Sequence, residues 1–263
     1  MMPVALTIAG SDPSGGAGIQ ADLKTFHQFG VYGEAVITLI TVQNTVGVSR
    51  VEFLSAELVA EQICAAAGDI PPQAAKTGAL GSREIVEAVA RLAADFRFPL
   101  VIDPVMLSKH GARLMDAGSR AAMCQRLIPC AALVTPNLAE AGELAGFEVC
   151  DARSMRRAAE ALVRMGARAA LVKGGHLEGP AVDILYDGAE FHEFTSARIQ
   201  TLHTHGTGCT YSAAITAELA RGAGLCEAVS RAKAYITQAI RTAPGLGGGA
   251  GPVNHHTPPD GQR

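Results

Sequence analysis

Short apolar runs alternate with longer segments of helical spacing along almost the whole of this 263-residue chain. Continuous apolar runs of this length suit strands that are covered on both faces. They predict strands at Pro3–Ala9, Ala35–Val42, Leu100–Val105, Ala132–Thr135 and Ala169–Lys173. The alternation therefore predicts an α/β fold, with a mostly parallel central sheet and helices on both of its faces.

The segments between these runs carry helix-capping residues. Ser55 and Ser82 each precede an amphipathic run, so we expect both to cap helices, the first of which extends to Ala67. The other expected helices are Ile19–Phe29, one near Gly118–Leu127, Ser154–Met165, Cys209–Arg221 and Glu227–Arg241.

Two strand-like runs lie close together in the second half of the chain. Val182–Tyr186 and Glu190–Phe194 flank Asp187-Gly188, which predicts a tight hairpin and thus antiparallel strands at one edge of the sheet. No Ser-rich linker or repeat divides the chain, so we expect one domain over residues 1–263. Its last part, 244–263, is rich in Gly and Pro and is expected to be loop or partly disordered.

Composition excludes several classes of function. The chain is 48% hydrophobic, too apolar for disorder, and its net charge of −3 offers no electrostatic footprint for nucleic acid. No apolar run approaches the ~20 residues that span a bilayer, and the first residues do not resemble a signal peptide, so no membrane partner is expected. The six scattered cysteines form no CxxC pair, which favours free thiols in the cytoplasm.

The strongest local signal is His205–Thr210, with the sequence HGTGCT, directly before an apolar helical segment. Backbone N–H groups of Gly206, Thr207 and Gly208 can converge there on a phosphate, helped by the helix dipole. The alternative is a plain glycine-rich loop, and spacing alone does not separate the two. Cys209 lies in the first helical turn, where the dipole lowers a thiol pKa, so it is either a reactive thiolate or a small packing residue.

Other nucleotide-binding motifs are missing or poorly placed. The chain contains no GxxxxGK[ST] sequence, which excludes a P-loop enzyme. Gly16–Ala21 fits the dinucleotide pattern GxGxxA, but it starts well beyond the end of its strand. The second strand ends at Gln43-Asn44 and not at the acidic residue that would hold a ribose, so no nicotinamide cofactor is expected.

Charged and amide side chains follow three of the expected strands. Asn137 and Glu140 can share a helix face and offer oxygen ligands to Mg²⁺, or they can be a helix cap and its capping-box partner. Asp103 is a candidate carboxylate ligand or a turn residue. Lys173, before two glycines, can place its charge against a phosphate or can be a solvated lysine beside a turn.

Several blocks, in order through nearly the whole chain, together resemble one known family. They are Ala5–Asp22 (ALTIAGSDPSGGAGIQAD), Val42–Thr45 (VQNT), Asp103–Met106 (DPVM), Thr135–Glu140 (TPNLAE), Lys173–His176 (KGGH), His205–Thr210 and Gly251–Val253 (GPV). In these blocks the chain is similar to the hydroxymethylpyrimidine/phosphomethylpyrimidine kinases of thiamine biosynthesis. The resemblance implies a ribokinase-like three-layer α/β/α sandwich, usually a homodimer, that uses ATP and Mg²⁺.

The resemblance also implies two ATP-dependent reactions at one site. The first phosphorylates 4-amino-5-hydroxymethyl-2-methylpyrimidine, and the second converts the monophosphate to the diphosphate. By matching positions, Gln43 would hydrogen-bond the pyrimidine edge and Asp22 would lie near its polar groups. Ala17, Val42 and Val105 would line the ring.

The same matching assigns the phosphate side of the reaction. Gly206–Cys209 would form the anion hole and Lys173 would neutralise phosphate charge. Asn137 and Glu140 would position Mg²⁺, with Asp103 as a further candidate ligand.

Two positions depart from what such families carry. Cys209 stands where many ribokinase-like sugar kinases have an aspartate base. Since the transition state of phosphoryl transfer is loose, a thiol can serve there as base or as positioning group. Ala79 stands where the family often has Met at the pocket wall, and losing that contact is worth roughly 1–3 kcal/mol of discrimination. This leaves substrate range open.

Two alternative functions remain at this point. One is a pyridoxal kinase of the same fold, and the other is a non-catalytic pyrimidine-binding regulator. The presence of Cys209, Lys173 and Glu140 together argues against the regulator.

Overall fold

The computed structural model describes residues 2–107, 111, 114–175, 177 and 179–259, so His176 and the last four residues of the tail lie outside it. The strands are β1 (Val4–Ser11), β2 (Tyr32–Gln43), β3 (Val48–Phe53), β4 (Ala74–Thr77), β5 (Leu100–Ile102), β6 (Leu133–Val134), β7 (Ala170–Lys173), β8 (Ala181–Tyr186) and β9 (Phe191–Ser196). The helices are α1 (Gly18–Gln28), α2 (Ala56–Asp69), α3 (Arg83–Ala93), α4 (Ala117–Ala122), α5 (Leu138–Ala145), α6 (Ala152–Arg164), α7 (Thr207–Ala220) and α8 (Leu225–Arg241). After α4 the chain continues as a π-helical segment, Met123–Leu127, and a 3₁₀ turn, Ile128–Cys130.

Among the described residues, the strands form one nine-stranded sheet in the order β3-β2-β1-β4-β5-β6-β7-β8-β9. From β2 through β1, β4, β5 and β6 to β7, each strand is parallel to the next in this order. The predicted hairpin is confirmed as β8 and β9, which turn at Asp187 and Gly188 and are antiparallel. The opposite edge is antiparallel too, because β3 returns along β2, and the prediction of a single antiparallel edge missed it.

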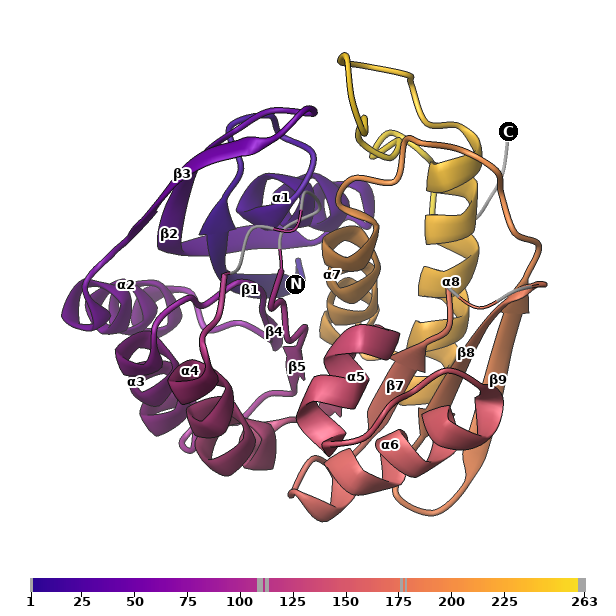
Figure 1. Cartoon of the computed structure of the whole chain (residues 1–263). Coiled ribbons are helices and arrows are strands. Elements are labelled where there is room, and N and C mark those ends of the chain that lie inside the picture. The colour runs from indigo at the N-terminus through magenta and orange to yellow at the C-terminus, as the bar shows by residue number, and fades with distance from the viewer. Residues whose placement is uncertain (1, 108–110, 112–113, 176, 178, 260–263) are drawn as a thin grey trace.

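Helices cover both faces of the sheet, which gives three layers (Figure 1). Strand residues alternate between the two faces. In β5, Leu100 and Ile102 pack into the core under α2 to α6, while Val101 packs into the core under α1, α7 and α8. The mostly parallel, three-layer α/β/α prediction is therefore confirmed.

Serine caps place the starts of α2 and α3 where the sequence predicts them. The Ser55 hydroxyl accepts a hydrogen bond from Leu58 N at 3.2 Å, and that of Ser82 accepts one from Ile85 N at 3.3 Å. Each cap satisfies an N–H that has no partner within its helix. Among the described residues, no helix is both long and apolar enough to cross a membrane.

Residues 244–259, the described part of the tail, have no helix and only an isolated bridge, yet they pack against the body of the molecule. Val253 and Thr257 are buried, and Pro252 pairs with His205. Residues 244–259 thus form a loop, as expected, and contacts with the rest of the molecule hold this loop in place. The assignment of the whole chain to one domain stays a prediction.

Candidate active site

A cavity of about 810 Å³ lies beyond the carboxyl ends of the central strands, where ligands bind in open α/β sheets. It collects nearly all the site residues that the sequence predicts. Those that line it are Ala17, Gln43, Ala79, Asp103, Val105, Asn137, Glu140, Lys173, Gly206, Thr207, Gly208 and Cys209. Asp22 and Val42 are the exceptions.

Val42 was expected to line the ring, and that expectation is wrong for a simple geometric reason. Side chains along a strand alternate between faces. In β2, Leu39, Thr41 and Gln43 face the cavity, so Val42 points the other way and is 54% exposed. The alternation along β2 thus turns the Gln43 side chain into the cavity and turns that of its neighbour Val42 away from it.

Asp22 was expected near the substrate, but its side chain is fully buried and does not reach the cavity. It accepts hydrogen bonds from Thr7 Oγ1 at 2.6 Å and from Lys76 Nζ at 2.7 Å. Burial disfavours the Lys76 ammonium, but the Asp22 carboxylate raises its pKa and keeps it charged. Asp22 therefore belongs to a buried ion pair beneath the site.

The turn before α7 is built from two chain segments in close contact. Gly206 has φ of +78°, and a Cβ there would lie 1.7 Å from the carbonyl oxygen of Gly16, so only glycine fits. This contact places the first turn of α7 beside the loop that leads into α1. The first N–H groups of a helix lack partners within it, so this turn can bind an anion.

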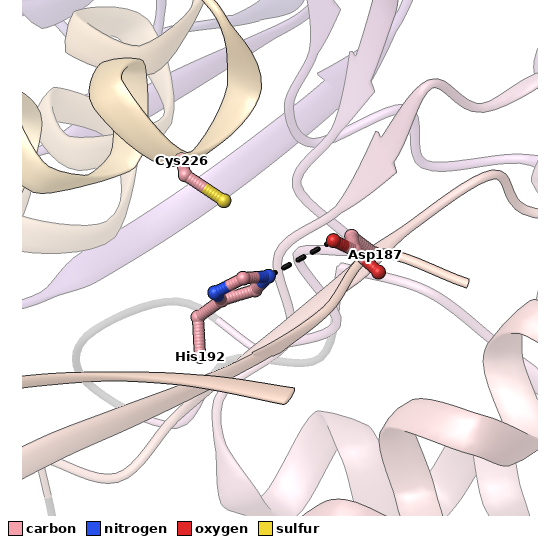
Figure 2. Close-up of side chains that lie close together, drawn as sticks. All are labelled: Asp187, His192 and Cys226. Atoms are coloured by element: carbon pink, nitrogen blue, oxygen red, sulfur yellow. Dashed lines mark hydrogen bonds and ion pairs between the residues drawn. The ribbon is translucent and has the colours of Figure 1, made fainter. Parts of the chain in front are cut away.

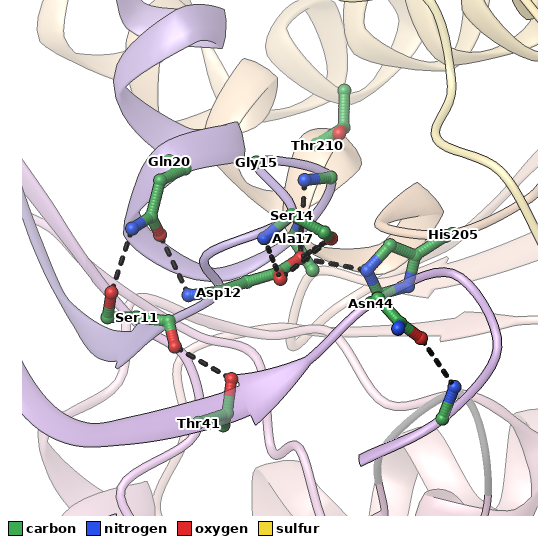
Figure 3. Close-up of polar contacts among 12 residues, drawn as sticks. Ser11, Asp12, Ser14, Gly15, Ala17, Gln20, Thr41, Asn44, His205 and Thr210 are labelled. Carbon is green, nitrogen blue, oxygen red and sulfur yellow. Dashed lines mark hydrogen bonds and ion pairs between the residues drawn. The ribbon is translucent and has the colours of Figure 1, made fainter. Parts of the chain in front are cut away.

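Asp12 and His205 hold these two segments together (Figure 3). The Asp12 carboxylate accepts backbone hydrogen bonds from Ser14 at 2.8 Å and Ala17 at 2.8 Å, and its Oδ2 lies 2.8 Å from His205 Nε2. Burial opposes ionisation of Asp12, but the hydrogen bonds from His205 and Ser14 lower its pKa below the usual range. The sequence motif contained both residues without indicating that they pair across 193 positions.

Lys173 and Asp103 lie directly beneath the turn. Lys173 Nζ donates to Asp103 Oδ1 at 3.0 Å, and a Cβ on Gly208 would lie 3.4 Å from that ammonium. Burial opposes the charge on Lys173, but Asp103 and Glu140 raise its pKa. A fixed positive charge therefore lies against the anion-binding turn.

Asn137 and Glu140 form the capping box of α5, the alternative that the sequence left open. The Asn137 side chain accepts a hydrogen bond from Glu140 N at 3.0 Å, and Glu140 Oε2 accepts one from Asn137 N at 2.8 Å. Both residues also line the cavity. Burial, with a smaller contribution from Asp103, raises the pKa of Glu140 to about 7.

Cys209 is half-buried on the first turn of α7, and the backbone N–H of Gly18 acts to lower the pKa of its thiol. The sequence predicts a lowered thiol pKa at this position. The structure corrects this, because burial raises the pKa of Cys209 to about 12 against the opposing effect of Lys76. The group is a neutral thiol at physiological pH.

Sequence reasoning missed Asp12 and His205, which line the cavity, and Lys76, which pairs with Asp22 beneath it. A buried ammonium in an apolar strand is costly without a partner, so Lys76 in the run AAKT was itself a signal. The β4 strand that carries it was not predicted.

A second cluster lies outside the cavity: Asp187, His192 and Cys226 place potential metal-ligand atoms within 4.8 Å of one another (Figure 2). Asp187 already accepts hydrogen bonds from Glu190 N at 2.8 Å and Ala189 N at 2.9 Å, and it pairs with His192. These hydrogen bonds lower the pKa of Asp187 to about 2, and the bond from Glu190 N has the largest effect. They close the β8–β9 turn, and we assign no metal to them.

Comparison with known proteins gives consistent matches. A family model described as phosphomethylpyrimidine kinase matches residues 12–254. The chain is 53% identical over 252 residues to the thiamine biosynthesis bifunctional protein ThiED of Geobacter sulfurreducens, covering 95% of this chain and about half, 51%, of that protein. It is 48% identical over 253 residues to a hydroxymethylpyrimidine/phosphomethylpyrimidine kinase of Streptomyces coelicolor, covering 96% of this chain and 94% of the relative.

Solved structures agree with the fold. The pyridoxal kinase from Staphylococcus aureus in complex with AMP-PCP and pyridoxal superposes with a TM-score of 0.90 at 38% identity, covering 98% of this chain and 94% of that one. The phosphomethylpyrimidine kinase from Clostridium difficile superposes with a TM-score of 0.81 at 44% identity, covering 90% and 99%.

Proposed function

Because the chain belongs to the phosphomethylpyrimidine kinase family, we infer that it transfers phosphoryl groups from ATP to 4-amino-5-hydroxymethyl-2-methylpyrimidine and then to the monophosphate. One observation carries this function: Gln43 and the Gly206–Cys209 turn line the same cavity. An amide that can donate and accept thus shares a cleft with an anion-binding helix start.

In this proposal the pyrimidine lies at the β2 end of the cavity. Gln43 hydrogen-bonds the ring edge, while Ala17, Ala79 and Val105 contact the ring faces. Past the turn the cavity continues toward β8 and α8, where Asp183 and Lys233 line it. ATP bound along that side would present its phosphates to the turn.

Charge that develops on the migrating phosphoryl group is stabilised by groups already in place. The N–H groups at the start of α7 point toward an anion at the helix end, and Lys173 adds a full positive charge. Asp103 holds that ammonium at 3.0 Å, so little reorganisation is needed. In this reaction the protein contributes positioning and charge stabilisation, and it forms no covalent bond to the phosphoryl group.

Oxygen donors beside the turn fit Mg²⁺. Asn137, Glu140 and Asp103 offer amide and carboxylate oxygens, the ligands that this cation prefers. Burial raises the pKa of Glu140 to about 7 even though the nearby Lys173 ammonium acts to lower it, so this carboxyl would gain from a second positive charge. These three residues would hold the ion directly or through water, and the ion would supply positive charge to the phosphates of ATP.

The family resemblance leaves two roles for Cys209, a base or a positioning group. A thiol with a pKa of about 12 is protonated at neutral pH and cannot accept a proton. Its burial beside Gly18 and Gly208 instead supports a positioning role for the substrate hydroxyl.

The pyridoxal kinase alternative is not favoured. Relatives at 44–50% identity carry the pyrimidine kinase name, whereas the structures titled pyridoxal kinase are 38–39% identical. Ala79 leaves more room at the ring than Met would, so substrate range is worth measuring.

An ATP-coupled assay that compares the hydroxymethylpyrimidine, its monophosphate and pyridoxal tests this function. We expect kcat/KM to be highest for the pyrimidines, with both phosphorylations observed. A clear preference for pyridoxal, or turnover of none of the three, would contradict the proposal.

We also propose the homodimer that the family resemblance implies and the cytoplasmic location that the cysteines favour. Ile40 and Val42 are 47% and 54% exposed on the outer face of β2, and an apolar face of this kind favours contact with a second copy. All six cysteines are free thiols, as suits a reducing compartment.

A further inference from the structure

The tail between α8 and Val253 lies between two loops that border the site. Gly249 N donates to Thr45 Oγ1 at 3.3 Å, and Gly251 N donates to His203 Nδ1 at 3.2 Å. Thr45 follows Gln43 closely, in the turn between β2 and β3. The tail, yellow in Figure 1, therefore contacts the ring-binding side of the site.

At Gly249 and Gly251 these contacts leave no room for a side chain. A Cβ on Gly249 would lie 2.1 Å from the Thr45 carbonyl oxygen, and one on Gly251 would lie 2.5 Å from His203 Nδ1. By contrast, a Cβ on Gly248 would meet only Val46 Cγ2, at an ordinary 3.9 Å. The glycines of this segment thus serve close packing, which is the opposite of what their number suggests for a tail.

The same segment is bonded to the phosphate side of the site. His205 N donates to Gly251 O at 3.0 Å, and Val253 N donates to His205 O at 3.3 Å. His205 directly precedes Gly206 and pairs with Asp12. Val253 is only 1% exposed, which anchors this end of the tail.

We propose that residues 247–253 form a positioning strap that sets the distance between the ring-binding end of β2 and the anion-binding turn of α7. The strap is a positioning element because none of these residues lines the cavity. Phosphoryl transfer needs the acceptor hydroxyl and the phosphate in register, and a misplacement of about 1 Å can cost roughly 10²-fold in rate. This role rests on the proposed function.

Adjacent glycines provide a matched test. Gly249→Ala pushes on the Thr45 carbonyl, so we expect KM for the pyrimidine to rise about tenfold and kcat to fall, with KM for ATP unchanged. Gly248→Ala adds the same methyl group without that contact and should match wild type in all three constants. Equal constants for the two variants, or an equal rise of both KM values in Gly249→Ala, would overturn the strap.

A second pair of variants covers the case in which Gly249→Ala does not fold. Thr45→Val removes the hydroxyl that accepts the hydrogen bond from Gly249, whereas Thr45→Ser keeps it. We expect only Thr45→Val to raise the pyrimidine KM, at an unchanged thermal midpoint. If the wild-type enzyme phosphorylates the pyrimidine and both Thr45 variants behave alike, the strap fails while the proposed function stands; if wild type does not, the function itself fails.

Discussion

The thiol of Cys209 lies between opposing electrostatic effects. The dipole at the start of α7 and the Lys76 ammonium favour a thiolate, while burial and the carboxylates of Asp22 and Asp103 oppose it. Burial is the largest of these, and the pKa rises to about 12. At the scale of a single residue, desolvation therefore outweighs the helix dipole and keeps the Cys209 thiol protonated.

If Cys209 positions the substrate hydroxyl, Cys209→Ala should lower kcat by roughly 10²-fold with the pyrimidine KM nearly unchanged. Steady-state kinetics in the ATP-coupled assay measure both constants. Cys226→Ala is the control, since Cys226 also lies in the first turn of a helix but outside the cavity. Unchanged turnover in Cys209→Ala would remove this residue from the mechanism.

The buried Lys76–Asp22 pair predicts a large loss of stability when one partner is removed. Lys76→Met leaves the Asp22 carboxylate buried without its cation, which should cost about 3–5 kcal/mol in the free energy of unfolding. Urea denaturation measures it, and adding Asp22→Asn should recover part of the loss. Glu87→Gln, at the exposed Arg83–Glu87 pair, should stay near wild type. A similarly small effect of Lys76→Met would contradict the pairing.

At the scale of elements, the start of α7 is held by several neighbours at once. Gly206 contacts Gly16, the His205 ring pairs with Asp12, and Thr210 Oγ1 lies 3.0 Å from His255 Nε2 in the tail. A helix start held from these sides keeps its N–H groups in place without rearrangement during the reaction.

The glycine at the start of α7 should be needed for more than its backbone conformation. Gly206→Ala must both adopt a positive φ and displace Gly16, so we expect a large loss of kcat/KM. Gly222, just after α7, has φ of +88° with open space around it. Gly222→Ala should therefore lose about 1 kcal/mol of stability and keep its activity. Parallel losses of activity in the two variants would contradict this.

His255 predicts a loss of stability on the acid side. Burial, then the nearby charge of Lys24, lowers its pKa to about 4, against about 6.5 when unfolded. The unfolded chain thus binds more protons between these values, so the free energy of unfolding falls as pH drops from 6.5 toward 4. His255→Gln should flatten that fall in denaturation at several pH values, whereas His256→Gln, at an exposed site, should not. An equally steep fall in both variants would contradict the assignment.

At the scale of the whole molecule, both sheet edges are antiparallel and the parallel centre carries the cavity. The edge formed by β2 and β3 brings Gln43 into the cavity on one face and leaves Ile40 and Val42 exposed on the other. The same alternation that builds the ring-binding wall therefore builds an apolar outer surface.

If that outer surface joins two copies, Val42→Lys should convert a dimer into a monomer, because a charge buried at an apolar interface is costly. Sedimentation velocity measures the change. Met2→Lys, at an exposed apolar residue before β1, is the control and should remain dimeric. A monomeric wild type, or a dimer that withstands Val42→Lys, would contradict the proposed homodimer.

Prediction from sequence succeeded where a signal was local. Ser55, Ser82 and the Asp187-Gly188 turn act within a few residues of their own position, and the structure confirms them. The strands β3 and β4 were missed because β3 is half polar and exposed, and β4 has the sequence AAKT, in which two polar residues follow two alanines and leave no continuous apolar run. Asp22 and Val42 were misplaced because register and depth within a layer have no signature in local spacing.

The order of apolar runs, caps and glycine turns determined, without any coordinates, a parallel α/β sheet whose strand ends carry Asp103, Asn137 and Lys173. Those properties depend on neighbours in the chain and on the fact that parallel strands end at one edge of the sheet. Only the tertiary structure decided that Asp12 pairs with His205, that Lys76 neutralises Asp22, and that Cys209 is a neutral thiol. Each of these depends on burial and on partners distant in sequence, which local composition does not encode.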